Sequence, residues 1–419
     1  MKQTLILFII NITIFWLWAD TVFAQNVSSK TYHVADGSSK QFVDILEQVE
    51  DGDTVILGSG RYHGNFHINK SILLMTHSKA VLTADNEGTI LTISAPNTRV
   101  EGLTLQNSGN DISAKDACIF ITEVAHGTQI VANEMSECGF AIWLDAASQV
   151  FIKNNTITGT EQAIVSDRGN GIHLFNTNDS IVEGNRIKLG RDGIYISNSE
   201  NVLIKNNEMY NTRFGIHYMY SHNCQVTGNT ISHSSVGAAV MFSKNIVVKK
   251  NMFERNKEHG LLLRDVIDSN IKDNTSRHNK IGLLLGSSYY NVIQKNCFSR
   301  NTMAAHVFSS DYNEVFDNDF IDNKLQLKFL STQSIVWSGP DRGNYWSHYP
   351  GREVSKNGIG SKKFQVTNLS DWLSFSYPLL KIILHSPAMK LLAKFENEFP
   401  VLSKPAIIDN YPLMSSIAC

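Results

Sequence analysis

The sequence of 419 residues predicts an all-β solenoid, a right-handed parallel β-helix with coils of about 22 residues. Nine asparagines recur along the chain, and seven of their eight intervals are 22 or 23 residues. The remaining interval, 30 residues, is a repeat with eight residues inserted. Such self-similarity is typical of solenoids, in which each repeat buries its apolar residues only against its neighbours. The asparagines are Asn133, Asn155, Asn185, Asn207, Asn229, Asn251, Asn274, Asn296 and Asn318.

Apolar residues inside each repeat alternate with a period of two, which indicates β-strands rather than helices. One inward pair is predicted per coil: Ile172/Leu174, Ile194/Ile196, Ile216/Tyr218, Ala238/Val240, Leu261/Leu263 and Leu283/Leu285. A second strand of each coil contributes one further inward residue: Val182, Ile204, Val226, Val248, Ile271 and Ile293. We therefore expect three short strands per coil.

Glycine and asparagine are expected to shape the corners between these strands. A glycine lies 14 residues before six of the asparagines: Gly171, Gly193, Gly215, Gly237, Gly260 and Gly282. We expect the glycine to supply a turn backbone that other residues adopt at a cost. We expect the asparagine to take a left-handed corner while its side-chain amide hydrogen-bonds the same corner of the next coil.

Two terminal segments differ from the solenoid. Residues 1–24 predict a signal peptide, with an apolar stretch and a small-x-Ala site ending at Ala24, so the mature chain is expected to be exported. An uncleaved anchor is the alternative. Seven of the eight prolines lie from Pro340 onward, and proline cannot sit inside a ladder of parallel strands. We therefore assign residues 25–336 to the β-helix and 337–419 to a C-terminal loop and helical tail.

Helices are predicted near both ends of the solenoid. An amphipathic helix over residues 41–46 is expected to cover the open N-terminal end of the core. In the tail, Ser386 and Pro387 predict a helix start, preceded by an apolar run over residues 379–384. The apolar face of the tail helix is Ala388, Leu391, Leu392 and Phe395. This face either caps the solenoid or docks to a partner.

Composition limits the partners. Thirty-seven basic and 39 acidic residues leave no basic stripe, which argues against a nucleic-acid partner. Of the five cysteines, Cys118 and Cys138 lie close to one coil apart and can face each other. Cys224 falls at an inward position, where free cysteine behaves as a small hydrophobe, and Cys297 at an outward one. Cys419 has no interpretable context.

A candidate metal site emerges from the outward positions of consecutive coils. His217, Met219 and Met241 are expected to form one exposed triangle, because adjacent coils are about 4.8 Å apart and alternate strand residues about 6.6 Å. His173 lies two coils away on the same ridge. Thioether and imidazole ligands suit Cu(I). The alternative is a docking patch for a protein or glycan.

Carbohydrate chemistry is the competing class of function. The tripeptide Arg186-Ile187-Lys188 is similar to an element of pectin-cleaving β-helix hydrolases, but their paired aspartates and Gly-His-Gly motif are missing. Glycosidic cleavage needs two carboxylates flanking the bond, and Asp179 stands without such a partner. We therefore predict no enzymatic activity, with a periplasmic carbohydrate-binding or carbohydrate-cleaving protein as the alternative.

Several motifs resemble the NosD family, the periplasmic maturation factors of nitrous oxide reductase. The residues that carry the resemblance are Gly215–Ser221, Asp192–Tyr195, Leu384–Ala388, Phe399–Leu402 and Pro405–Asp409. The resemblance spans essentially the whole mature chain. It implies a non-enzymatic periplasmic protein that works with an ABC-type transporter, comprising an ATPase and a membrane permease, and a copper-carrying lipoprotein. Together these would assemble the copper–sulfide centre of the reductase, with copper bound at most transiently.

One departure concerns a calcium site. Related β-helix proteins follow the segment equivalent to residues 343–347 with an aspartate-rich loop. Here residues 348–358 contain a single carboxylate, Glu353. Because calcium takes about 6–8 oxygen ligands, several of them carboxylates, no calcium site is predicted.

Overall fold

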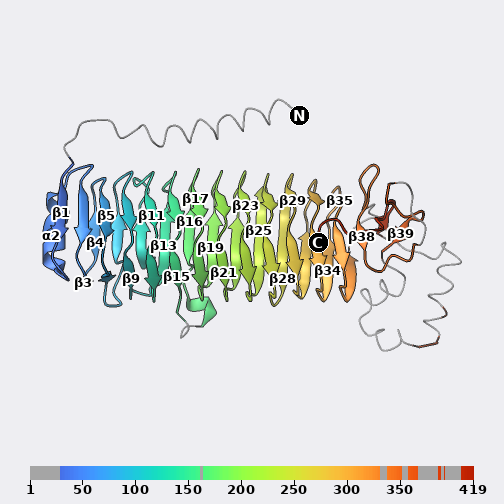
Figure 1. Cartoon of the computed structure of the whole chain (residues 1–419), viewed down its shortest axis with the longest axis horizontal. Coiled ribbons are helices and arrows are strands. Elements are labelled where there is room, and N and C mark those ends of the chain that lie inside the picture. Colours follow the sequence, from blue (N-terminus) through green and yellow to red (C-terminus); the bar gives the residue numbers. More distant parts are fainter. Residues whose placement is uncertain are drawn as a thin grey trace, which may run out of the picture.

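Three long parallel sheets wind around one core along the whole molecule (Figure 1). The computed structural model describes residues 29–160, 164–330, 337–351, 357–366, 386–387, 391 and 407–419. Each coil contributes one strand to each sheet, in the order sheet A, sheet B, sheet C. The predicted right-handed parallel β-helix with three strands per coil is therefore confirmed.

Sheets A and B contain 13 strands each. Sheet A comprises β1 (Thr31–Val34), β2 (Thr54–Leu57), β5 (Leu73–Thr76), β8 (Arg99–Glu101), β11 (Gln129–Val131), β14 (Phe151–Lys153), β17 (Ile181–Glu183), β20 (Leu203–Lys205), β23 (Gln225–Thr227), β26 (Val247–Lys249), β29 (Asn270–Lys272), β32 (Val292–Gln294) and β35 (Glu314–Phe316). Sheet B comprises β3 (Gly60–His63), β6 (Ala80–Thr83), β9 (Thr104–Gln106), β12 (Glu134–Ser136), β15 (Thr156–Thr158), β18 (Arg186–Lys188), β21 (Glu208–Tyr210), β24 (Thr230–Ser232), β27 (Met252–Glu254), β30 (Thr275–Arg277), β33 (Cys297–Ser299), β36 (Asp319–Ile321) and β38 (Tyr345–Trp346).

Sheet C contains 12 strands, several of them longer than those of the other sheets. They are β4 (Phe66–Ile68), β7 (Leu91–Ile93), β10 (Ala117–Ile121), β13 (Phe140–Asp145), β16 (Ile172–Phe175), β19 (Asp192–Ser197), β22 (Phe214–Met219), β25 (Val236–Lys244), β28 (His259–Ile267), β31 (Ile281–Gly286), β34 (Met303–Phe308) and β37 (Leu325–Leu330). A short antiparallel pair, β39 (Phe364–Gln365) and β40 (Ile408–Asp409), lies beyond the last coils, and a 3₁₀ turn spans Val165–Asp167.

The predicted register of the core is confirmed. Every residue of the predicted inward pairs, and every predicted inward residue of the second strand, is at most 1% exposed. Consecutive coils place like positions beside one another, as in the pairing of Ile194 with Ile216 and of Ile216 with Ala238. The core is therefore one continuous column of stacked, mostly aliphatic side chains.

The predicted asparagine ladder is also confirmed. Asn229 is 1% exposed, and its Oδ1 accepts hydrogen bonds from the backbone N–H and the Nδ2 of Asn207, at 2.9 and 3.0 Å. Its own Nδ2 donates to the carbonyl of Ile204 at 3.0 Å. Asn344 extends the ladder by one rung beyond Asn318. Each rung thus ties a corner to the corners of both neighbouring coils.

Two details of the corner prediction are wrong. The left-handed conformation belongs to the residue before each ladder asparagine, for example Asn206, with φ 55°, and Gly228, with φ 68°. The six predicted turn glycines do not have positive φ. Steric crowding explains why glycine is needed at these positions. A Cβ built at Gly193 would lie 2.6 Å from the carbonyl oxygen of Gly215 in the next coil. These glycines permit close approach of backbones at the corner.

The N-terminal cap is confirmed as helix α2 (Ser39–Gln48). Its apolar face of Phe42, Ile45 and Leu46 is buried, and Phe42 packs on the rings of Tyr62 and Phe66. The helix lies across the blue end of the stack in Figure 1. The signal peptide predicted for residues 1–24 lies outside the described residues.

The C-terminal end of the core is closed by aromatic side chains. Trp337 and Trp346 are each 1% exposed, and Trp346 stacks on Phe320 with ring centroids 4.2 Å apart. Asp409 is buried beside them and accepts hydrogen bonds from the Trp346 indole at 2.8 Å and the Asn344 N–H at 2.7 Å. Burial raises the pKa of Asp409, although these donors oppose the shift. Strand β40 is thereby joined to the last coils.

The predicted tail helix falls mostly outside the described residues. Only Ser386, Pro387 and Leu391 of that segment are described, and the apolar run over residues 379–384 is not. Its role as cap or docking element stays a prediction. Among the helices of the described ranges, none has the length and apolarity needed to cross a membrane.

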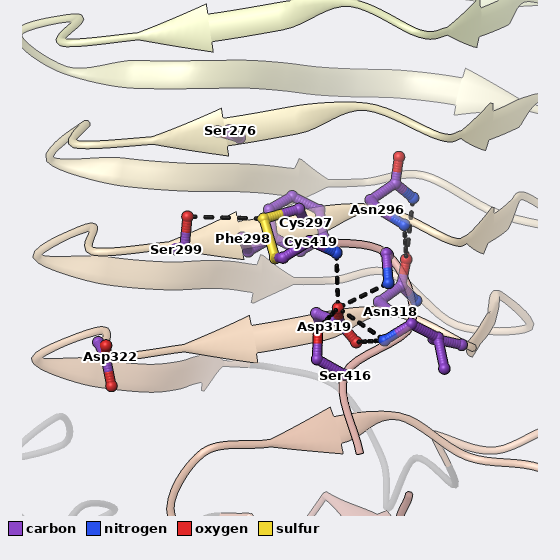
Figure 2. The surroundings of a disulfide bond; sticks show 12 residues. Ser276, Asn296, Cys297, Phe298, Ser299, Asn318, Asp319, Asp322, Ser416 and Cys419 are labelled. Atoms are coloured by element: carbon purple, nitrogen blue, oxygen red, sulfur yellow. Dashed lines mark hydrogen bonds between the residues drawn. A yellow bond between two sulfur atoms is a disulfide. The ribbon is translucent and has the colours of Figure 1, made fainter.

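The last residues of the chain fold back onto sheet B (Figure 2). Asp319 is fully buried, and its carboxylate accepts hydrogen bonds from the Ser416 hydroxyl and from three consecutive backbone N–H groups, those of residues 417–419, at 2.6 to 3.1 Å. Cys419 forms a disulfide with Cys297. Cys297 points outward as predicted, but it is only 4% exposed. We call residues 416–419 with Asp319 and Cys297 the C-terminal clasp.

The other cysteines behave as expected. Cys118 and Cys138 form a disulfide with a Cα–Cα distance of 5.7 Å. Cys224 is free and fully buried in the core, and burial raises the pKa of its thiol to about 12. It is therefore a packing residue and not a reactive thiolate.

The ladder yields a first testable prediction. Asn229→Ala should lower the free energy of unfolding by about 1–3 kcal/mol, because the buried N–H of Asn207 and carbonyl of Ile204 lose their partner. The control Thr230→Ala, at the exposed neighbouring position, should change it by less than about 0.5 kcal/mol. Urea unfolding followed by circular dichroism measures both, and equal losses would contradict the role of the ladder.

The clasp yields a second prediction. Asp319→Asn replaces a charged carboxylate with a neutral amide and weakens the charge-assisted hydrogen bonds, so the amides of residues 417–419 should exchange about tenfold faster or more. Hydrogen exchange measured by mass spectrometry tests this, with the exposed Asp322→Asn as the control. Unchanged protection of these three amides in Asp319→Asn would show that the disulfide alone holds the terminus.

Candidate metal site

The outward face of sheet C carries all four predicted site residues. Met219 ends β22 and pairs in register with Met241 in β25. Both methionines are half-buried, whereas their inward neighbours Tyr218 and Val240 are fully buried. The two thioethers therefore lie on one outward column in adjacent coils, in the arrangement that the sequence predicts.

His217 also faces outward, but the expectation that it is exposed is wrong. Only 7% of the residue is exposed, because the rings of Phe214 and Tyr195 pack against the imidazole at centroid distances of 4.6 and 4.9 Å. Its Nδ1 lies 2.9 Å from Oδ2 of Asp192, in the preceding coil. Its Nε2 is buried and has no hydrogen-bond partner. The imidazole is thus fixed through one nitrogen and leaves the other unsatisfied.

Asp192 is the residue that orients His217. It is fully buried, and Arg213 binds its carboxylate with both Nε and Nη2, at 2.8 and 2.7 Å. Burial opposes ionisation of Asp192, but the hydrogen bonds from His217 and Arg213 outweigh it and hold the pKa of the carboxyl below its usual range. An ionised Asp192 can only accept hydrogen bonds, so Nδ1 of His217 carries the proton. In the neutral imidazole, Nε2 then presents a lone pair.

His173 lies two coils away and belongs to an aromatic stack. It stacks on Trp143 with ring centroids 3.7 Å apart and contacts Tyr195 at 4.6 Å, so that Tyr195 stands between the two histidines. Its Nδ1 lies 3.0 Å from the side-chain amide nitrogen of Asn170. Burial lowers the pKa of His173 to about 3, although nearby Asp192 opposes the shift. His173 is therefore a neutral side chain that shares the stack with His217 without contacting it.

Sequence reasoning missed two features of this face. The Asp192–Arg213 pair joins residues 21 positions apart that precede the alternating part of their strands. Tyr220 and Phe242, directly after the two methionines, stack with centroids 4.9 Å apart and are 51% and 37% exposed. Both have left-handed backbones, with φ of 51° and 50°, which bulky residues adopt at a cost. Their spacing of 22 residues, the length of one coil, would have allowed this pair to be predicted from the sequence.

Within the described ranges, no three His, Cys, Asp or Glu side chains gather closely enough to hold a metal ion. The candidate donors on this face are accordingly the thioethers of Met219 and Met241 and Nε2 of His217. The predicted absence of a calcium site stays a prediction, since residues 352–356 of the relevant loop lie outside the described residues.

Comparison with solved structures supports the fold. The A-modules of the mannuronan C-5 epimerases AlgE4 and AlgE6 from Azotobacter vinelandii match with TM-scores of 0.60 and 0.59, and each match covers 74% of this chain and 99% of the module. Sequence identity is only 15% and 14%, so these matches show the β-helix architecture alone.

Comparison with protein families and curated proteins is more specific. Residues 153–351 match a family model described as periplasmic copper-binding protein (NosD). A protein of Pseudomonas aeruginosa named probable ABC transporter binding protein NosD is 38% identical over 388 residues, which cover 89% of this chain and 91% of the relative. Its namesake in Stutzerimonas stutzeri is 36% identical over 374 residues, 85% of this chain and 86% of the relative. The chain therefore belongs to the NosD family.

Proposed function

We propose that this protein is a periplasmic accessory factor that receives and presents Cu(I) during maturation of nitrous oxide reductase. The observation that carries the proposal is the register pairing of Met219 with Met241 beside His217, whose Nε2 is free of any hydrogen bond. The description of the family as periplasmic copper-binding supports the same chemistry.

The donor types fit the proposed cargo. Thioethers are soft ligands that favour Cu(I) over calcium or magnesium, and imidazole adds a nitrogen donor. Asp192 and Arg213 hold His217 in the tautomer whose Nε2 can donate to a metal, an arrangement common behind metal-binding histidines. The long unbranched side chains of methionine can adapt to an ion shared between adjacent coils.

The surroundings of the methionines suit transfer between proteins. Tyr220 and Phe242 form an exposed aromatic pair immediately beyond them, and exposed aromatic residues are frequent at protein interfaces. Met241 also packs against an apolar cluster of outward-facing side chains that includes Leu262 and Leu284. A partner loop that docks here would reach the thioethers directly.

The partners in this proposal are an ABC-type transporter, a copper-carrying lipoprotein and nitrous oxide reductase. The names of the two relatives, probable ABC transporter binding protein, support the first of these. The apolar tail residues Leu391, Leu392 and Phe395 remain candidates for the transporter contact. No catalytic step is part of the proposal.

A Cu(I) titration tests the proposal. Purified mature protein should compete with a Cu(I) chelator for one ion, and the double substitution Met219→Ala/Met241→Ala should weaken its affinity at least about 100-fold, since both sulfur donors are removed. The matched control is Met252→Ala, a half-buried methionine in β27 on sheet B, which should leave the affinity unchanged. Weak binding that is identical in all three proteins would contradict a Cu(I) site and would indicate that Met219 and Met241 belong to a protein contact surface instead.

The burial of His173 as a neutral side chain is tested by the pH dependence of the free energy of unfolding. Its folded pKa of about 3 lies below the unfolded value of 6.5, so the unfolded state binds the proton first and stability falls as the pH drops below about 6.5. Between pH 7 and pH 5, wild type should lose about 2 kcal/mol more stability than His173→Gln. Urea unfolding at both pH values measures this. His173→Gln should also retain Cu(I) affinity, and loss of binding would instead make His173 a ligand.

A further inference from the structure

A basic groove lies away from the methionine face, at the corner where sheet B turns into sheet C. It has a volume of about 600 Å³ and is formed by residues that follow β27, β30, β33 and β36 in four successive coils. Five of its lining residues are cationic: Arg255, Lys257, Lys280, Arg300 and Lys324. Asp322 is the one carboxylate among the described lining residues. We call this the corner groove.

The floor of the corner groove is a second asparagine ladder. Asn256, Asn279 and Asn301 are at most 3% exposed, and each Nδ2 donates to the Oδ1 of the next asparagine at 3.1 to 3.2 Å. Their Oδ1 atoms also accept backbone N–H groups, as Asn279 does from Asn256 at 2.8 Å. The floor is therefore rigid, and its amides are already engaged. A ligand would have to be recognised by the cationic walls.

The walls hold more positive charge than the neighbouring carboxylates neutralise. Arg300, Lys257 and Lys324 take part in none of the ion pairs found among the described residues. Arg255 pairs with Glu254 and Lys280 with Glu258, but both cations are 56% exposed, and such surface pairs are weak and easily exchanged. His278 also lines the groove. Since the whole chain has a formal net charge of −2, this excess is local, and the expectation from composition that there is no basic stripe is wrong at this corner.

We propose that the corner groove binds a multivalent oxyanion of the phosphate class. The described lining residues are all polar or charged, which disfavours an apolar ligand, and a cation would meet five like charges. The basic residues recur in successive coils, so charges are spaced at about 4.8 Å along the groove. Arginine and lysine both bind phosphate oxygens, arginine through its fork and lysine as a point charge. Five cations are neutralised best by a ligand that presents several negatively charged phosphate groups to the groove.

The source of the phosphate groups is either a soluble oligophosphate or the headgroups of anionic phospholipids. Both present the same chemistry to Arg255, Arg300 and the lysines opposite. The proposal does not depend on copper, because the corner groove shares no residue with the Met219–Met241 ridge. Its failure and the failure of the copper proposal are therefore distinguishable.

Calorimetry with inorganic tripolyphosphate at low ionic strength tests the soluble source, and co-sedimentation with vesicles containing phosphatidylglycerol tests the lipid source. The variant is Lys257→Gln/Arg300→Gln/Lys324→Gln, which removes the three cations without an ion pair. The control, Lys188→Gln/Lys250→Gln/Lys295→Gln, removes three exposed lysines elsewhere on the solenoid. Circular dichroism confirms that both remain folded, and Cu(I) affinity should be unchanged in both.

Binding of either probe by wild type and the control, weakened at least tenfold in the groove variant and reduced by salt, supports the proposal and identifies the source. If neither probe binds to wild type, or if the groove variant and the control lose affinity equally, the proposal is overturned.

Discussion

The buried asparagine ladder is the interaction on which the rest of this structure depends. Each rung gives an amide oxygen to the preceding coil and an amide N–H to a backbone carbonyl, so adjacent coils cannot slip past one another without leaving buried polar groups unpaired. The hydrophobic core opposes a slip by one residue, because such a slip would turn inward side chains outward, and the ladder adds a penalty for any slip. A fixed register converts sequence spacing into spatial columns, and the features on sheet C and in the corner groove are such columns.

The features on sheet C follow from this constraint. Met219 meets Met241, Tyr220 meets Phe242, and Tyr195 lies between His173 and His217 because their spacing equals one coil. The same rule aligns the basic residues of the corner groove. What distinguishes the candidate metal site is a buried carboxylate, Asp192, that is paired with both an arginine and a histidine. Asp192 and Arg213 fix one nitrogen of His217 and leave the other without a partner, which is a costly arrangement unless something binds it.

The sequence was sufficient to predict the fold and the face on which each site residue lies, because both depend only on period. It could not predict the burial of His217, since this depends on the rings of Phe214 and Tyr195 filling the space above the imidazole. Nor could it pair Cys297 with Cys419, because no repeat connects residues 122 positions apart. The need for glycine at the corners was predicted correctly, but the predicted reason was a turn backbone angle that these glycines do not adopt. Close approach between coils is a tertiary constraint that a single repeat does not reveal.

The central claim is that Met219, Met241 and Nε2 of His217 form one Cu(I) site, and X-ray absorption spectroscopy of the Cu(I)-loaded full-length mature protein tests it most directly. The account predicts a first coordination shell containing two sulfur scatterers and one imidazole nitrogen, with the sulfur contribution lost in Met219→Ala/Met241→Ala. It also predicts that Asp192→Asn weakens the imidazole contribution while the sulfur signal remains. A shell of nitrogen and oxygen atoms only, unchanged in the methionine variant, would contradict the claim.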